Sequence, residues 1–203
     1  MKSTNFANAC RFLMLGATLL STAAWSQADP EWLKSWNEAQ ETRPATLAAS
    51  GRIAAEDEPG TSFIIHGRVF GPDGKPMSGV VVHAYHRDAA GYEFGAKDKA
   101  LTTWALQGWA ETDAEGRFEF QTIRPAPDHL GREAAHIHFT LQSETFGRQW
   151  APTVFLADDP KVTKRQRRRS DAAGEYSWVR EVRTTDGIQH VEVRFRLKEK
   201  ADF

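Results

Sequence analysis

Residues 112–123 read TDAEGRFEFQTI, a turn followed by a strand. The turn residues Asp113 to Gly116 precede the run Phe118–Ile123, which is rich in the aromatic and β-branched residues that strands favour. Short apolar runs separated by turn dipeptides continue from this segment in both directions. They predict further strands at residues 63–70, 79–85, 109–112, 136–142, 153–156 and 191–197. This spacing predicts an all-β fold, an antiparallel β-sandwich that occupies residues 61–203.

The composition is that of an ordinary folded chain, with 40% hydrophobic and 26% charged residues. The 26 Lys and Arg almost balance the 27 Asp and Glu, so the basic footprint expected of a nucleic-acid-binding domain is missing. We interpret the basic run KRQRRR at residues 164–169 as a solvated loop or helix; the alternative is a contact for an anionic partner. The single cysteine, Cys10, cannot form a disulfide within the chain. A bound metal would therefore be held by His, carboxylate or Tyr.

The first 28 residues are predicted to be a signal peptide. Lys2 and Arg11 supply positive charge, and the apolar residues 12–24 are too short to span a bilayer as a stable helix. Ala28 is a small residue at the predicted cleavage position. We expect a periplasmic or secreted protein with no membrane segment after cleavage; an uncleaved anchor is the alternative.

Residues 29–60 are predicted to form an N-terminal arm. Trp32 and Trp36 lie four residues apart, which suits one face of a short helix. Pro44, Gly51 and the Pro59-Gly60 pair then interrupt any regular pattern. We expect this arm to pack on the domain or on a partner.

Two histidines, His136 and His138, share one predicted strand. Side chains at i and i+2 of a strand point to the same face, so the two imidazoles should project side by side while Ile137 faces the other layer. Burying two unpartnered imidazoles in an apolar strand is costly, and metal ligation would offset that cost. Paired imidazoles suit iron, copper or zinc.

These segments resemble a known family. TDAEGRFEFQTIRPAP at residues 112–127, followed eight residues later by AHIHF, is similar to the core of the intradiol ring-cleavage dioxygenases, the protocatechuate 3,4-dioxygenase and catechol dioxygenase group. GRV at residues 67–69 with PDGKPMSGV at 72–80 resembles the family's opening hairpin, and FLADDP at 155–160 resembles a later strand and turn. The resemblance implies a sandwich with a mononuclear non-haem iron site. It also implies an oxidoreductase that uses dioxygen to cleave a small aromatic diol between its hydroxyl-bearing carbons.

The resemblance implies particular metal ligands as well. The family's ferric ion is held by two histidines, matched by His136 and His138, and by two tyrosines, one of which acts as a base. The first tyrosine is expected two residues after the glycine of a D-x-x-G-x-Y turn, where this chain has Glu93, with Tyr92 one position earlier. The second is expected after Pro-x-Pro, where this chain continues with Asp128 and His129.

A further departure concerns the substrate. The family carries a guanidinium three residues before the first histidine. Glu133 stands there in this chain, and Arg132, one position earlier, is the candidate for binding substrate. Thr153 stands where the family usually has a polar amide.

Three completions of the metal site remain open. Glu93 would give two histidines and one carboxylate, a set that favours ferrous iron. A shifted loop would let Tyr92 serve as ligand and catalytic base. His129 would give three imidazoles, which suit copper or zinc. Asp128 is either a ligand or a turn residue.

The other histidines carry weaker signals. His83 and His86 fall on opposite faces of one predicted strand, and His86 is a candidate donor to a metal ligand. His66 and His190 have no partner that the sequence reveals, so a structural role is expected. The tryptophans near the ligand-bearing segments either line an aromatic pocket or pack in the core; they are Trp104, Trp109 and Trp150.

We predict an exported, metal-dependent dioxygenase that acts on a catechol or other small phenolic compound in aromatic compound catabolism. The alternative is a non-catalytic copper- or zinc-binding module, and a third option is a structural carrier domain without metal. The sequence is compatible with a homo-oligomer.

Overall fold

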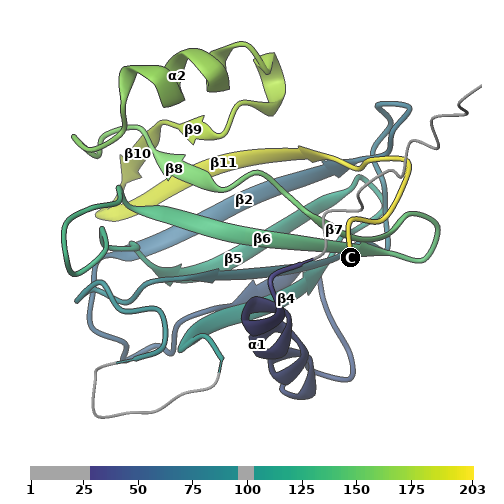
Figure 1. Ribbon diagram of the computed structural model, residues 1–203, viewed down its shortest axis with the longest axis horizontal. Helices are drawn as coiled ribbons and strands as arrows, with labels where there is room; N and C mark the ends of the chain where they lie inside the picture. The colour runs from purple at the N-terminus through teal and green to yellow at the C-terminus, as the bar shows by residue number, and fades with distance from the viewer. Residues whose placement is uncertain (1–27, 96–102) are drawn as a thin grey trace, which may run out of the picture.

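The computed structural model describes residues 28–95 and 103–203, so the predicted signal peptide up to residue 27 lies outside the described residues (Figure 1). The elements are α1 (Pro30–Glu41), β1 (Ser50–Arg52), β2 (Ser62–Phe70), β3 (Val81–His86), β4 (Leu106–Glu111), β5 (Arg117–Ile123), β6 (His136–Ser143), β7 (Gly147–Trp150), β8 (Val154–Leu156), α2 (Lys164–Asp171), the 3-10 turn η1 (Gly174–Tyr176), β9 (Val179–Arg180), β10 (Val182–Thr185) and β11 (Ile188–Arg196). Every strand predicted from the sequence is present.

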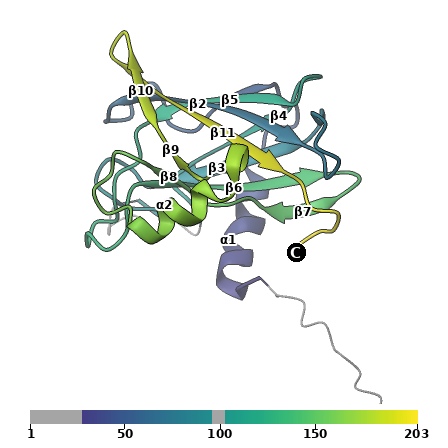
Figure 2. The same ribbon diagram turned by 90° about the horizontal axis from the view of Figure 1, so that it is seen from above.

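Two sheets packed face to face confirm the predicted β-sandwich (Figure 2). The five-stranded sheet has the order β1-β5-β2-β11-β10, and the six-stranded sheet has the order β4-β3-β6-β8-β9 with β7 also paired to β6. Most neighbours are antiparallel, as predicted, but β1 with β5, β2 with β11, and β8 with β9 are parallel. The last long strand therefore lies beside the first long strand and runs in the same direction.

Alternation along the strands separates a buried inner face from an outer face. Ile65 on β2 and Val191 on β11 point into the core, where they meet Ile137 of β6 from the facing sheet. Because neighbouring residues on a strand point to opposite faces, the histidines next to these core residues lie on the outer faces of the two sheets.

The predicted short helix is α1, which covers the outer face of the six-stranded sheet (Figures 1 and 2). Asp29 caps the helix, accepting hydrogen bonds from the first-turn backbone, and Pro30 occupies its first position. The buried face carries Trp36, whose Nε1–H donates to Thr140 Oγ1 on β6 at 3.3 Å. A second apolar cluster forms between helix and sheet from Trp36, Ala39, Tyr85, Trp104 and Trp109.

Two segments differ from simple expectation. Gly51 does not interrupt the regular structure but lies in strand β1. A Cβ at this position would come within 2.3 Å of the Trp109 carbonyl oxygen, so this close backbone approach requires glycine. The basic run forms α2, the helical option of the prediction, and a reciprocal capping box between Thr163 and Gln166 begins it. No helix in the described part of the chain is long and apolar enough to cross a membrane.

Candidate metal centre and aromatic pocket

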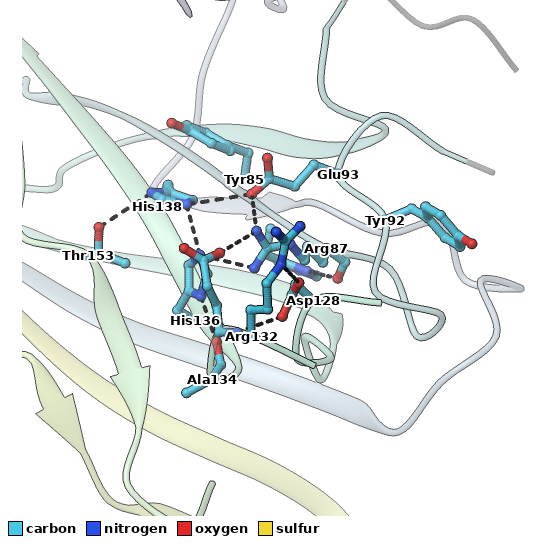
Figure 3. A network of polar contacts seen from close by, with 12 residues as sticks. Tyr85, Arg87, Tyr92, Glu93, Asp128, Arg132, Ala134, His136, His138 and Thr153 are labelled. Atoms are coloured by element: carbon cyan, nitrogen blue, oxygen red, sulfur yellow. Dashed lines mark hydrogen bonds and ion pairs between the residues drawn. The ribbon is translucent and has the colours of Figure 1, made fainter. Parts of the chain in front are cut away.

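The predicted histidine pair lies at the start of β6, with the Nε2 atoms of His136 and His138 3.0 Å apart (Figure 3). The Nδ1–H of His136 donates to the Ala134 carbonyl at 2.7 Å, which leaves the Nε2 lone pair facing His138. Burial, followed by the neighbouring His138, lowers the pKa of His136, so its ring stays in the neutral form that can bind a metal. On its other edge His138 places Nδ1 3.4 Å from Thr153 Oγ1.

Glu93 joins this pair from the loop that follows β3. Its Oε1 lies 3.7 Å from His138 Nε2, and the three ligand atoms are all within 4.8 Å of one another. Burial tends to raise the pKa of Glu93, but the close contact with His138 and the charge of Arg87 outweigh it and lower the pKa. The side chain is therefore a carboxylate. Among the residues that the structure describes, this is the one group of three or more His, Cys, Asp and Glu side chains whose ligand atoms are close enough to hold a metal ion together.

The turn before Glu93 explains why this residue, and not Tyr92, reaches the histidines. Asp88 Oδ1 accepts hydrogen bonds from the backbone N–H groups of Ala90 and Tyr92, both at 2.9 Å, and Gly91 has the left-handed φ of 87°. Beyond this turn Glu93 points towards the histidines and Tyr92 points away from them (Figure 3).

Tyr92 and His129 are not brought to the pair, and the structure contradicts their prediction as ligands and that of Tyr92 as catalytic base. Their rings stack on each other with centroids 4.5 Å apart, and Tyr92 points away from the histidines (Figure 3). Asp128 shapes the loop instead of ligating, because its Oδ1 accepts from the Glu133 backbone N–H at 2.6 Å.

The guanidinium beside the centre belongs to Arg87, not to Arg132 as predicted. The Arg87 side chain is 13% exposed, and its Nη2 lies 2.7 Å from Glu133 Oε2 and 3.3 Å from Glu93 Oε1. Its Nη1 lies 3.4 Å from His136 Nε2. Arg132 is 74% exposed and has its nearest anionic contact, Asp128, at 3.8 Å. The sequence feature that could have identified Arg87 is its position between the strand predicted at residues 79–85 and the turn that precedes Glu93.

An aromatic pocket of about 530 Å³ opens beside the centre. Its lining includes Trp32, Tyr85, Phe94 and Trp104 together with Glu93 and His138. The Tyr85 ring stacks on Trp104 at 3.8 Å and on His138 at 4.9 Å, and its hydroxyl accepts from Trp32 Nε1–H at 2.9 Å. Burial raises the pKa of Tyr85, so it remains a neutral phenol.

The predicted tryptophans divide between the two roles. Trp104 lines the pocket, whereas Trp109 is buried in the cluster beneath α1. Trp150 packs against Trp32 and Phe203, with ring centroids 5.2 Å and 4.7 Å away. Helix α1 thus closes one side of the pocket through Trp32.

His83 and His86 occupy opposite faces of β3, as predicted. His86 Nδ1–H donates to the Arg87 carbonyl at 2.7 Å and Nε2 contacts Thr122 Oγ1 at 2.8 Å, so the prediction that it donates to a metal ligand is wrong. It holds the backbone from which Arg87 extends. Burial lowers the pKa of each of these two histidines to about 4.

The donor set fits a divalent transition metal. Two imidazoles with Nε2 atoms directed at one space and one ionised carboxylate form the set found at open non-haem iron sites. The Ala134 carbonyl orients one imidazole, as outer partners of metal ligands commonly do.

Comparison with known proteins agrees with this geometry, since the family model described as Dioxygenase matches residues 40–196. The chain belongs to the intradiol dioxygenase family. Most of α1, including Trp32 and Trp36, precedes the matched residues, so much of the pocket wall that this helix provides lies outside the family model.

Two curated relatives illustrate the family match. The chain is 34% identical over 123 residues to catechol 1,2-dioxygenase 1 of Acinetobacter lwoffii, covering 52% of this chain and 39% of the relative. It is 32% identical over 110 residues to the protocatechuate 3,4-dioxygenase beta chain of Burkholderia cepacia, covering 50% and 47%. The matched region thus spans less than half of either relative.

Solved intradiol dioxygenase structures share the fold. Catechol 1,2-dioxygenase from Acinetobacter sp. ADP1 superimposes with a TM-score of 0.57 at 18% identity, covering 83% of this chain and 69% of that chain. The dioxygenase domain of a carbohydrate-binding protein fusion from Streptomyces sp. SirexAA-E gives 0.54 at 24% identity, covering 72% and 86%.

Proposed function

We propose that the protein is an exported, mononuclear metal-dependent dioxygenase that acts on a catechol or another small phenolic compound with dioxygen. The observation that carries the proposal is the meeting of His136, His138 and Glu93 beside an aromatic pocket, in a member of the intradiol dioxygenase family. Breakdown of aromatic compounds is the corresponding role.

Iron is the metal we propose, held by His136, His138 and Glu93. Two imidazoles and one carboxylate favour the ferrous ion and leave coordination positions open. Bound iron would supply the oxygen chemistry that amino-acid side chains cannot perform. Glu93 stands where the family resemblance places a tyrosine, so we expect a site without a phenolate ligand.

The chain's own groups would bind and orient the substrate. The aromatic lining of the pocket, which includes Trp32, Phe94 and Trp104, suits a small aromatic ring. Arg87 carries a positive charge beside the histidines, where it would attract a deprotonated hydroxyl of the diol. Glu133 holds that guanidinium in place at 2.7 Å. Tyr85, kept neutral, would act as wall and not as base.

Metal analysis and oxygen consumption together test the proposal. The purified chain, loaded with ferrous iron without air, is expected to hold one iron and to consume dioxygen when catechol is added. After the iron has been oxidised to the ferric state in air, the protein should show little visible colour, because no phenolate reaches the metal. Glu93→Tyr, oxidised in the same way, should introduce a phenolate and a visible phenolate-to-ferric charge-transfer band. One equivalent of copper or zinc with no oxygen consumption would favour the non-catalytic metal-binding alternative.

Export is a separate part of the proposal. It is supported by the charged start, the apolar residues 12–24 and the small residue Ala28, and by a helix cap at Asp29 directly after the proposed cleavage position. Amino-terminal sequencing of protein recovered from the periplasm or medium should begin at Asp29. Recovery from the cytoplasm with residue 1 intact would contradict it.

A further inference from the structure

A second pair of histidines meets on the outer face of the five-stranded sheet. β2 and β11 lie side by side in parallel, with His66 opposite Glu192 and His190 opposite Ile64. His66 Nε2 and His190 Nδ1 are 3.1 Å apart, and the two rings lie within 7° of parallel. The two nitrogens therefore face the same small space.

Glu119 on β5 orients this pair. It lies opposite His66 in the sheet, and its Oε2 is 3.2 Å from His66 Nδ1. With the hydrogen of His66 on Nδ1, beside this carboxylate, the Nε2 lone pair faces His190. Metal-binding histidines commonly donate their other N–H to a carboxylate in this way.

Further carboxylates line the concavity that holds the pair. His66 and His190 line a concavity of about 540 Å³ that also carries the carboxylates of Asp171, Glu181 and Glu192. Arg180 and Arg183 lie there too, so with Glu119 the acidic groups outnumber the basic ones. Glu192 is 65% exposed, and its ion pair with Arg183 is a loose 3.9 Å contact, so it is free to turn towards the histidines.

We propose that His66 and His190 bind a divalent transition-metal ion of the zinc and copper class, at a site separate from the centre on β6. The ion would replace the hydrogen shared between the two nitrogens, and that hydrogen would move to Nε2 of His190. Glu192 and water would complete the coordination, which mixes imidazole and oxygen ligands. Because the third ligand must move into place, the affinity should be lower than at the centre formed with Glu93.

Zinc titration of the full mature chain tests the site. In a His136→Ala/His138→Ala background, which removes the centre on β6, calorimetry with Zn²⁺ alone should still find one equivalent. Adding His190→Gln should abolish that binding. Adding Glu119→Gln should weaken it by about tenfold or more, the usual cost of losing the outer partner of a metal ligand. His129→Gln, which removes an exposed histidine elsewhere, is the matched control and should change nothing.

The chain with its own β6 histidines provides an independent test in case the background variant does not fold. It should bind two equivalents of Zn²⁺, and His66→Gln or His190→Gln should each reduce this to one, with circular dichroism unchanged. An unchanged number of sites and affinity in His190→Gln would overturn the proposal. So would the absence of zinc binding in a folded His136→Ala/His138→Ala chain.

Discussion

The two histidine pairs are nearly equal in spacing and different in everything around them. The ring nitrogens are 3.0 Å apart in the pair on β6 and 3.1 Å apart in the pair of β2 and β11. His136 is buried beneath a loop that adds a carboxylate and a guanidinium, whereas His66 is only half-buried, in a concavity lined largely by charged side chains. The two pairs therefore differ in the segments that cover them: those above the pair on β6 add the carboxylate, the guanidinium and the aromatic pocket.

The largest expected effect is a loss of oxygen uptake when a histidine of the β6 pair is replaced, but not when His66 of the other pair is replaced. His138→Ala should lower iron binding and catechol-dependent oxygen uptake by more than about 100-fold, since the loss of an outer partner alone costs about 10–100-fold. His66→Gln, on the other sheet, should leave oxygen uptake unchanged. An oxygen electrode and elemental analysis measure both. Loss of uptake in the folded His66→Gln chain would show that the pairs are not independent.

Loosening helix α1 from the six-stranded sheet is expected to have the next largest effect, on stability. Trp36→Ala should reduce the free energy of unfolding by about 3–5 kcal/mol, because it empties the contact between α1 and the six-stranded sheet. Ile64→Ala, at a half-buried position on the outer face of the other sheet, should cost only roughly 1 kcal/mol. Urea denaturation compares the two variants. Equal losses would mean that α1 contributes no more to stability than this half-buried position.

The buried histidine His83, on the sheet face beneath α1, should also make the free energy of unfolding depend on pH. Burial lowers the pKa of His83 to about 4 in the folded protein, from the ordinary histidine value of 6.5, so between these pH values the unfolded chain binds more protons. The free energy of unfolding should therefore fall as the pH drops from about 6.5 to 4, by roughly 3 kcal/mol for this residue. His83→Gln should make that fall shallower in urea denaturation at several pH values. An unchanged slope would contradict the burial effect.

The smallest effect concerns the guanidinium of Arg87, which the loop after β3 places beside the histidines. Arg87→Gln should raise KM for catechol by about tenfold, the cost of one charge-assisted hydrogen bond, with iron content measured in parallel. Arg132→Gln removes an exposed guanidinium and should change KM less than twofold. Equal effects of the two variants on KM would contradict the proposal that Arg87 binds the substrate. Steady-state oxygen uptake provides the measurement.

The features that could be predicted are those that depend only on residues close together in the sequence. Alternating apolar and polar positions located every strand of the prediction, and the i, i+2 spacing of His136 and His138 placed both rings on one face. The choice between Tyr92 and Glu93 could not be made in the same way, because the Asp88–Gly91 turn decides which of two adjacent side chains points inward.

Arg87 and the second pair show the same limit over longer distances. Arg132 is nearer to His136 in the sequence, but Arg87 reaches it because β3 and β6 are neighbours in the sheet. His66 and His190, 124 residues apart, meet only because β11 returns beside β2.

Local sequence is thus sufficient for the seven predicted strands, their inner and outer faces and the histidine pair on β6, since the period of a β-strand acts over two residues. It did not reveal the shorter strands β1, β7, β9 and β10. Tertiary structure alone decides what surrounds each pair. The third ligand, the cation, the aromatic wall of α1 and the partner of His66 all come from segments that approach one another when the sheets pair and pack.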